Sequence, residues 1–175
     1  MTVDLAKLRE MTERNVTALH ARPEFVVLFA TGAGAGVQQL LWQEPGTSRT
    51  LLDAKYTLLD AELPYANEAL IDILGEAPPQ WCSRGTAIRM AVAAEARARS
   101  LTIRGGKKDA LVVGLGLTAA VPTDHERRGE DRVHIAVKTV RGIFVCSASF
   151  AKGGLDRRTI GELCDLLGVN AITTV

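Results

Sequence analysis

The chain has 175 residues, 47% of them hydrophobic and 23% charged, which suits one domain with a packed core and excludes a disordered segment. A formal net charge of +1 argues against nucleic-acid binding, which usually needs a basic excess. Three cysteines without a C-x-x-C pair, no signal-like N-terminus and no membrane-length apolar run predict a cytoplasmic protein that has no disulfide framework, metal, cofactor or membrane partner.

Helices and buried strands alternate over the first half of the chain. Apolar residues at helical spacing predict an amphipathic first helix that ends before Pro23. The run Phe-Val-Val-Leu-Phe-Ala is typical of a strand buried on both faces. The predicted elements are a helix at 3–21, a strand at 25–30, a glycine turn at 31–36, a helix at 37–42, one or two strands within the tandem repeat at 49–63, and a helix at 66–75.

The second half of the chain continues this alternation. Ser83 has the side chain and position of an N-cap for a long helix. The remaining predicted elements are a helix at 84–100, a buried strand at 110–117, a polar loop at 118–131, a half-buried strand at 132–140, a strand at 143–150 paired with it as a hairpin, and a helix at 155–168. This order predicts a three-layer α/β/α sandwich with a mixed, mostly parallel sheet. We expect a single domain over residues 1–175, with an N-terminal helix at 1–22 and a core at about 25–168.

The glycine turn is the strongest local signal for a binding site. Gly32, Gly34 and Gly36 follow a buried strand and open a helix, where free N–H groups and the helix dipole favour phosphate or carboxylate. Their spacing is neither the dinucleotide fingerprint nor a P-loop, so a tight turn for helix–sheet packing remains the alternative.

A second candidate region lies at 118–132, after another buried strand. Ligands of open α/β sheets bind beyond the carboxyl ends of strands, where Thr118 supplies a hydroxyl and Arg128 and Arg132 supply phosphate-binding forks. A solvated loop of balanced charges is the alternative. His134 is either a general base or a surface residue.

These motifs together resemble the C-terminal domain of the CinA family, which includes nicotinamide-nucleotide amidohydrolases. The resemblance covers about residues 25–168 and rests on Pro45-Gly-Thr-Ser48, on Tyr65-Ala-Asn-Glu-Ala-Leu70 and on the ungapped spacing from Gly34 to Gly46. It is closer to a branch fused to nucleotidyltransferase-like domains in plants, through Pro45-Gly-Thr-Ser-Arg-Thr50, Gly114-x-Gly-x-Thr118 and Arg128-Gly-x-x-Arg132.

The resemblance implies an amide hydrolase whose ligand resembles nicotinamide mononucleotide, in a homo-oligomer. The sequence shows no metal-ligand cluster, so we expect the hydrolysis to be metal-free. The family's serine falls on Thr31, which becomes the candidate nucleophile, and Tyr65 and Lys55 become its proton-handling partners. The glycine turn, Asn67, Thr118, Arg128 and Arg132 would then hold the ligand. The family's lysine falls on Leu70, however, and its acidic residue falls on Ala30.

Two functions therefore stay open. The first is a divergent nicotinamide-mononucleotide amidohydrolase that uses Thr31. The second is a non-catalytic nucleotide-binding or assembly module that kept the fold and lost the chemistry.

Overall fold

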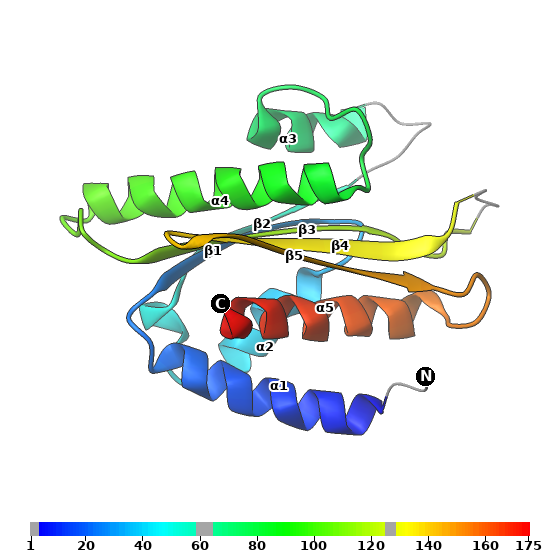
Figure 1. Cartoon of the computed structure of the whole chain (residues 1–175), viewed down its shortest axis with the longest axis horizontal. Helices are drawn as coiled ribbons and strands as arrows, with labels where there is room; N and C mark the ends of the chain where they lie inside the picture. The colour runs from blue at the N-terminus through cyan, green and yellow to red at the C-terminus, as the bar shows by residue number, and fades with distance from the viewer. Residues whose placement is uncertain (1–3, 59–64, 125–128) are drawn as a thin grey trace.

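The computed structural model describes residues 4–58, 65–124 and 129–175. Figure 1 shows the elements in chain order, which are α1 (Leu5–His20), β1 (Phe25–Thr31), α2 (Ala35–Gln43), the short 3₁₀ helix η1 (Thr47–Arg49), β2 (Leu51–Thr57), α3 (Tyr65–Leu74), α4 (Arg84–Arg104), β3 (Val112–Ala120), β4 (Asp131–Thr139), β5 (Gly142–Phe150) and α5 (Arg157–Thr174).

The five strands form one mixed sheet in the order β2-β1-β3-β4-β5. β1 pairs in parallel with β2 and β3, whereas β4 is antiparallel to both β3 and β5. Four strands therefore run in one direction and β4 runs against them. This confirms the predicted mixed sheet, with its parallel part in the centre, and the predicted β4–β5 hairpin.

Helices cover both faces of the sheet, which confirms the three-layer sandwich (Figure 1). One face carries α4, with α3 outside it, and the other carries α5, α2 and α1. β1 is continuously apolar because both of its faces are buried under helices. Val26 and Leu28 belong to the buried cluster of α1, α2 and α5, while Val27 and Phe29 belong to the cluster under α4.

Helix ends follow local chemistry in three places. Ser83 caps α4 as predicted, because its side chain accepts a hydrogen bond from the Thr86 N–H. Asp4 caps α1 through the Lys7 N–H, and Asp156 caps α5 through the Thr159 N–H.

The last helix is longer than predicted and ends at Thr174 instead of residue 168. Gly168 lies inside α5, facing α2. A Cβ at this position would lie 2.8 Å from Cγ2 of Val37, so the glycine permits close helix packing. Val169 and Ile172, beyond it, are buried in the core.

The predicted loop at 118–131 is also shorter than expected. β3 continues to Ala120, which pairs with Arg132 of β4, and β4 begins at Asp131, which pairs with Phe150 of β5. Thr118 therefore lies in a strand and not in a loop.

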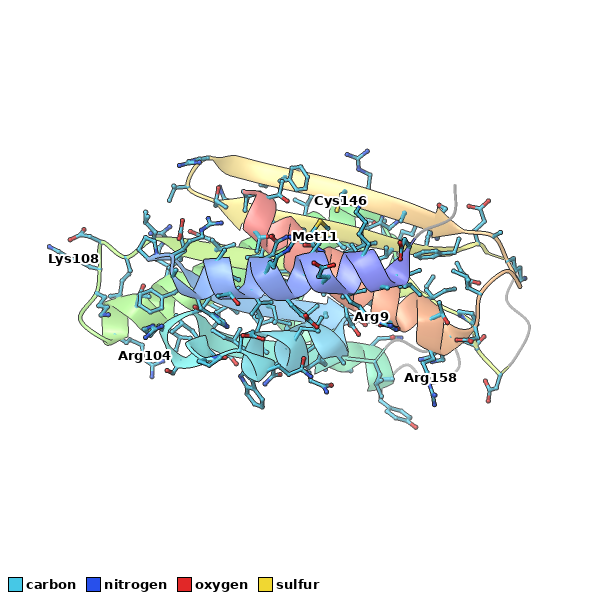
Figure 2. All side chains as sticks on the ribbon, turned by 90° about the horizontal axis from the view of Figure 1, so that it is seen from below. Arg9, Met11, Arg104, Lys108, Cys146 and Arg158 are labelled. Carbon is cyan, nitrogen blue, oxygen red and sulfur yellow. The ribbon has the colours of Figure 1, made fainter. Side chains whose placement is uncertain are left out.

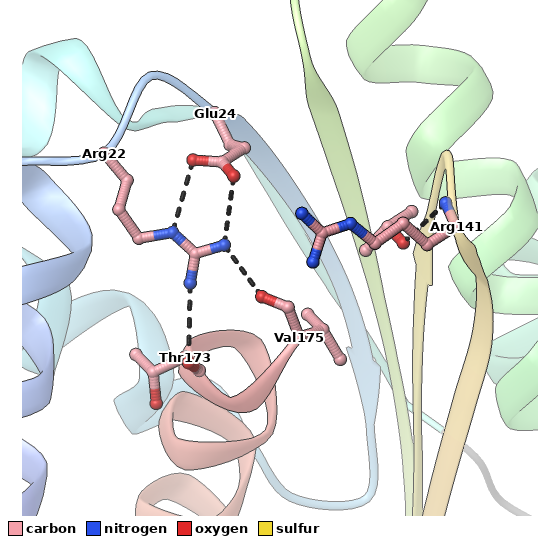
Figure 3. A network of polar contacts seen from close by, with 6 residues as sticks. Arg22, Glu24, Arg141, Thr173 and Val175 are labelled. Atoms are coloured by element: carbon pink, nitrogen blue, oxygen red, sulfur yellow. Dashed lines mark hydrogen bonds and ion pairs between the residues drawn. The ribbon is translucent and has the colours of Figure 1, made fainter.

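A polar network fastens the end of α5 to the start of β1 (Figure 3). Arg22 Nη2 lies 3.0 Å from Glu24 Oε1 and donates to the Val175 carbonyl at 2.8 Å. Its Nη1 donates to the Thr173 carbonyl at 3.4 Å. The Arg22 guanidinium lowers the pKa of Glu24 against the opposing effect of burial.

Across the described ranges, no helix has the length and hydropathy of a membrane span.

Candidate functional site

A row of polar side chains crosses all five strands of the sheet. The row is formed by in-register neighbours on successive strands, and in sheet order it consists of Thr57, Thr31, Thr118, His134 and Ser147. Paired residues of neighbouring strands project from the same face. The row therefore faces α4, and in β1, β2 and β3 it lies at or near the carboxyl ends of the strands.

The three threonines of this row form its buried part. Thr31 is 1% exposed, and its Oγ1 donates to the Thr57 carbonyl at 3.0 Å. Thr118 is also buried and donates to the Trp81 carbonyl at 3.0 Å. The Thr57 hydroxyl is buried and has no hydrogen-bond partner within the described residues. The hydroxyls of Thr31 and Thr118 thus connect backbone segments around the strand ends.

The other end of the row is more open and is positively charged. His134 Nδ1 lies 2.7 Å from the Ser147 hydroxyl. Arg132, two residues earlier on the same face of β4, donates to the Cys82 carbonyl at 3.5 Å, and Arg84 is exposed at the start of α4. Burial lowers the pKa of His134, and the charges of Arg132 and Arg84 lower it further. The imidazole is therefore mainly neutral at pH 7 in a field that favours anions. We call Arg84, Arg132 and His134 the basic cluster.

The glycine turn differs from the expectation of an open hollow. Gly36 N–H donates to Oδ1 of Asp165 at 3.1 Å, so a carboxylate of α5 occupies a donor at the N-terminus of α2. Gly34, the N-cap, has no side chain with which to cap α2, and Asp165 supplies that bond from a distant element. Burial raises the pKa of Asp165 to about 6, although the Gly36 N–H opposes the rise.

Gly32 is required by close packing. Its φ is +78°, and a Cβ there would lie 1.9 Å from the Ala119 carbonyl oxygen. The end of β1 can therefore lie against β3 only without a side chain. This geometry agrees with the packing alternative for the turn.

A pocket of about 190 Å³ lies beside the turn, on the α5 side of the sheet. It is lined by residues 32–36, Val121, Arg157, Gly161 and Asp165. Thr118 and Arg132, in contrast, belong to the opposite face. This pocket therefore differs from the expected one, which was to join the turn to the polar residues of 118–132.

The structure does not link the three predicted catalytic side chains by hydrogen bonds within the residues it describes. Thr31 bonds to Thr57, as above. The Lys55 amine lies 5.8 Å from the centroid of the Phe29 ring, at the exposed side of β2. Tyr65 begins α3 and is 72% exposed.

Among the positions that carry the resemblance, Leu70 is fully buried. It packs in the apolar cluster of Phe29 and Met90 under α4. Asn67 is half-buried in the first turn of α3. Arg128, a predicted phosphate ligand, lies outside the described residues.

The remaining candidates for metal or thiol chemistry are few. The described part of the chain holds no group of three or more histidine, cysteine or acidic side chains placed to bind a metal. Burial raises the pKa of Cys82 even though Arg132 lies near, so its position before α4 does not activate the thiol.

Sequence reasoning missed Ser147 and Asp165. Both left a signal. The two-residue turn at Val140-Arg141 fixes the hairpin register and thereby places residue 147 opposite His134. Asp165 lies between Cys164 and Leu166, which are both buried, so an acidic residue at that position needed a partner.

No protein-family model and no curated protein matches the chain by sequence. Solved structures do match it. The competence/damage inducible protein CihA from Agrobacterium tumefaciens has a TM-score of 0.70 at 20% identity, over 99% of this chain and 98% of that one. A competence-damaged protein (CinA) superfamily protein from Escherichia coli has a TM-score of 0.71 at 17% identity, over 100% and 94%. A CinA superfamily protein from Enterobacter cloacae gives 0.70 at 16%, over 95% and 90%. The chain therefore has the fold of the CinA superfamily structures.

Proposed function

We propose that this chain is a divergent CinA-like module that binds a small anionic molecule of the nucleotide class and does not hydrolyse it through Thr31. This proposal rests mainly on Thr31, which is 1% exposed and whose hydroxyl donates a hydrogen bond to the Thr57 carbonyl. Kinship with the plant fusion branch is part of this proposal and rests on the sequence motifs alone.

The chemistry of a nucleophilic hydroxyl supports the loss of catalysis. Such a hydroxyl needs a base within hydrogen-bond reach and access to the substrate carbon. The proton of Thr31 is directed at a backbone carbonyl, which cannot act as the base. The family's lysine position holds Leu70, whose side chain is part of the core. Within the described residues, the Thr31 hydroxyl therefore has no base as its hydrogen-bond partner, and it is not exposed to a substrate.

The charge of the basic cluster supports anion binding. Arg84 and Arg132 present guanidinium groups, which bind phosphate through paired N–H donors. After the larger effect of burial, the charges of both arginines lower the pKa of His134, which supports a positive field in one common region. That region lies beside β3 and β4 at the start of α4, on the face where the polar row ends.

His134 provides the direct test of binding. The pKa of its imidazole is measured by NMR titration, alone and with nicotinamide mononucleotide or inorganic phosphate. A bound anion offsets the charges of Arg84 and Arg132, so the pKa of His134 should rise in its presence. Arg132→Gln should abolish that rise, and Arg104→Gln should keep it, because Arg104 lies at the far end of α4, about 30 Å away. An unchanged pKa with both ligands contradicts anion binding at this cluster.

An activity measurement tests the other half of the proposal. We expect no ammonia release from nicotinamide mononucleotide, above that of heat-denatured protein. Ammonia release that disappears in Thr31→Ala would restore the catalytic alternative. Thr31→Ser serves as the matched variant, because it keeps the hydroxyl.

One observation favours that alternative, a metal-free amide hydrolase. The buried Thr57 hydroxyl lacks a partner beside Thr31, within the described residues. A buried hydroxyl without a partner is costly, and a substrate that entered here would satisfy it. Crystals soaked with nicotinamide mononucleotide would place the ligand either at Thr57 or at the basic cluster.

A further inference from the structure

β5 is an edge strand that lacks the usual protection against pairing. It lies at the end of the sheet, and Figure 2 shows it along one long side of the molecule, beyond α5. Its nine residues include no charge and no proline. The opposite edge strand, β2, carries Asp53 and Lys55 and a register shift, which are features that discourage edge pairing. A long edge strand without charged side chains can pair with a strand of another chain through its outward N–H and C=O groups.

The hairpin register shows which backbone groups of β5 point away from β4. Thr139 and Gly142 flank a two-residue turn and pair with each other, which makes them a hydrogen-bonded pair. The pattern alternates from there. The residues whose N–H and C=O point away from β4 are therefore Ile143, Val145, Ser147 and Ser149.

These free groups are complementary to a second copy of themselves. In an antiparallel pair centred on Cys146, residue 143 lies opposite residue 149 of the second copy, and residue 145 lies opposite residue 147. In this register, every outward-pointing N–H and C=O of the four residues has a partner in the second copy. A pairing centred on any other residue of β5 leaves some of these groups without a partner. The contact is isologous, as a two-fold axis requires.

The side chains fit the same register. On the α5 face, Phe144 would lie opposite Ala148 of the second copy, and Phe150 opposite Gly142, so each large ring meets a small residue. Phe144 is 41% exposed in the single chain and would be covered. The absence of charge in β5 means that the two-fold axis brings no like charges together.

We propose that the chain forms a two-fold dimer in which β5 of each copy pairs antiparallel about Cys146, extending the sheet from five strands to ten. At the axis, Cys146 lies opposite Cys146 of the second copy in a non-hydrogen-bonded pair, with Cα atoms about 4.5 Å apart. This separation is within the range that a disulfide spans.

Light scattering after size exclusion tests the assembly. The expected mass is twice the 18.8 kDa of the chain. Copper-phenanthroline oxidation should cross-link the dimer through Cys146, so Cys146→Ser should abolish the cross-link. Cys82→Ser should retain it, because Cys82 lies before α4 and not on β5. A monomer, or a cross-link that survives Cys146→Ser, would overturn the proposal.

A charge exchange tests the register independently of cysteine. Ile143 and Ser149 are exposed and lie opposite each other only across the axis. Ile143→Glu with Ser149→Glu places like charges in direct opposition twice and should yield a folded monomer. Ile143→Lys with Ser149→Glu makes the same pairs attractive and should remain a dimer. Circular dichroism confirms folding of both variants. Dimers of equal stability in the two variants would refute β5 pairing.

Discussion

Asp165 is the residue whose substitution tests the account of the glycine turn most directly. Its carboxylate is largely removed from solvent and accepts one hydrogen bond, from the Gly36 N–H. Burial raises its pKa to about 6 from the ordinary 3.8, with a smaller contribution from the charge of Glu162. The folded protein therefore holds a proton on Asp165 more tightly than the unfolded chain does.

The sign of the effect follows from this order of pKa values. Stability contributed by the proton is complete below pH 3.8 and is lost as the pH rises to about 6. Since one pH unit corresponds to about 1.36 kcal/mol, the rise amounts to about 3 kcal/mol at most. Solvent still reaches part of the carboxylate, so about 1–2 kcal/mol is the better expectation. Asp165→Asn keeps an acceptor for Gly36 and removes the charge.

We therefore expect Asp165→Asn to raise the free energy of unfolding by about 1–2 kcal/mol at pH 8, with the gain shrinking towards pH 4. Urea unfolding at four or five pH values measures it. Asp156→Asn, at the N-cap of the same helix, is the matched control. The pKa of Asp156 is lowered by the Thr159 N–H, so that substitution should destabilise at pH 8. A loss of stability at pH 8 in Asp165→Asn, or a gain independent of pH, would refute the reasoning.

Three other substitutions, the first with a matched control, test close packing and buried hydrogen bonds. Gly32→Ala should cost about 3 kcal/mol or more in urea unfolding, because its Cβ would overlap the Ala119 carbonyl, whereas Gly106→Ala, with the same φ of +78° and open space, should cost about 1–2 kcal/mol. Leu70→Lys, which introduces the lysine of the CinA motif that this segment resembles, should lower stability by about 3 kcal/mol or more and give no ammonia release, since the side chain is fully buried. His20→Ala should cost about 2–3 kcal/mol in urea unfolding, because the ring makes two buried hydrogen bonds at 2.8 and 2.9 Å.

The architecture could be predicted because its signals are local. The continuous apolar run of β1, the Ser83 cap and the alternation in β4 each depend on residues close in sequence. The predicted end of α5 at residue 168 was wrong, because nothing near in sequence shows what Gly168 packs against. Its actual role depends on Val37, more than a hundred residues away.

The site was harder to predict because it depends on register and on which face a residue occupies. The sequence places Thr31 and Thr118 at strand ends, and they are indeed neighbours on adjacent strands. It could not show that both hydroxyls would be directed at carbonyls. Nor could it show that Asp165 would reach Gly36 from the last helix. Such contacts between distant elements decide whether a motif is open to a ligand.

The position of Asp165 also explains why an anion site should lie at the basic cluster and not at the turn. A phosphate at Gly36 would compete with an internal carboxylate for one N–H group and would meet its negative charge. With a pKa of about 6, Asp165 is mostly ionised at pH 7 and above, so the turn disfavours anions there. Arg84 and Arg132 favour them on the opposite face of the sheet, where their charges already act on His134. The glycine turn thus joins α2, β3 and α5, and the proposed anion site lies across the sheet from it.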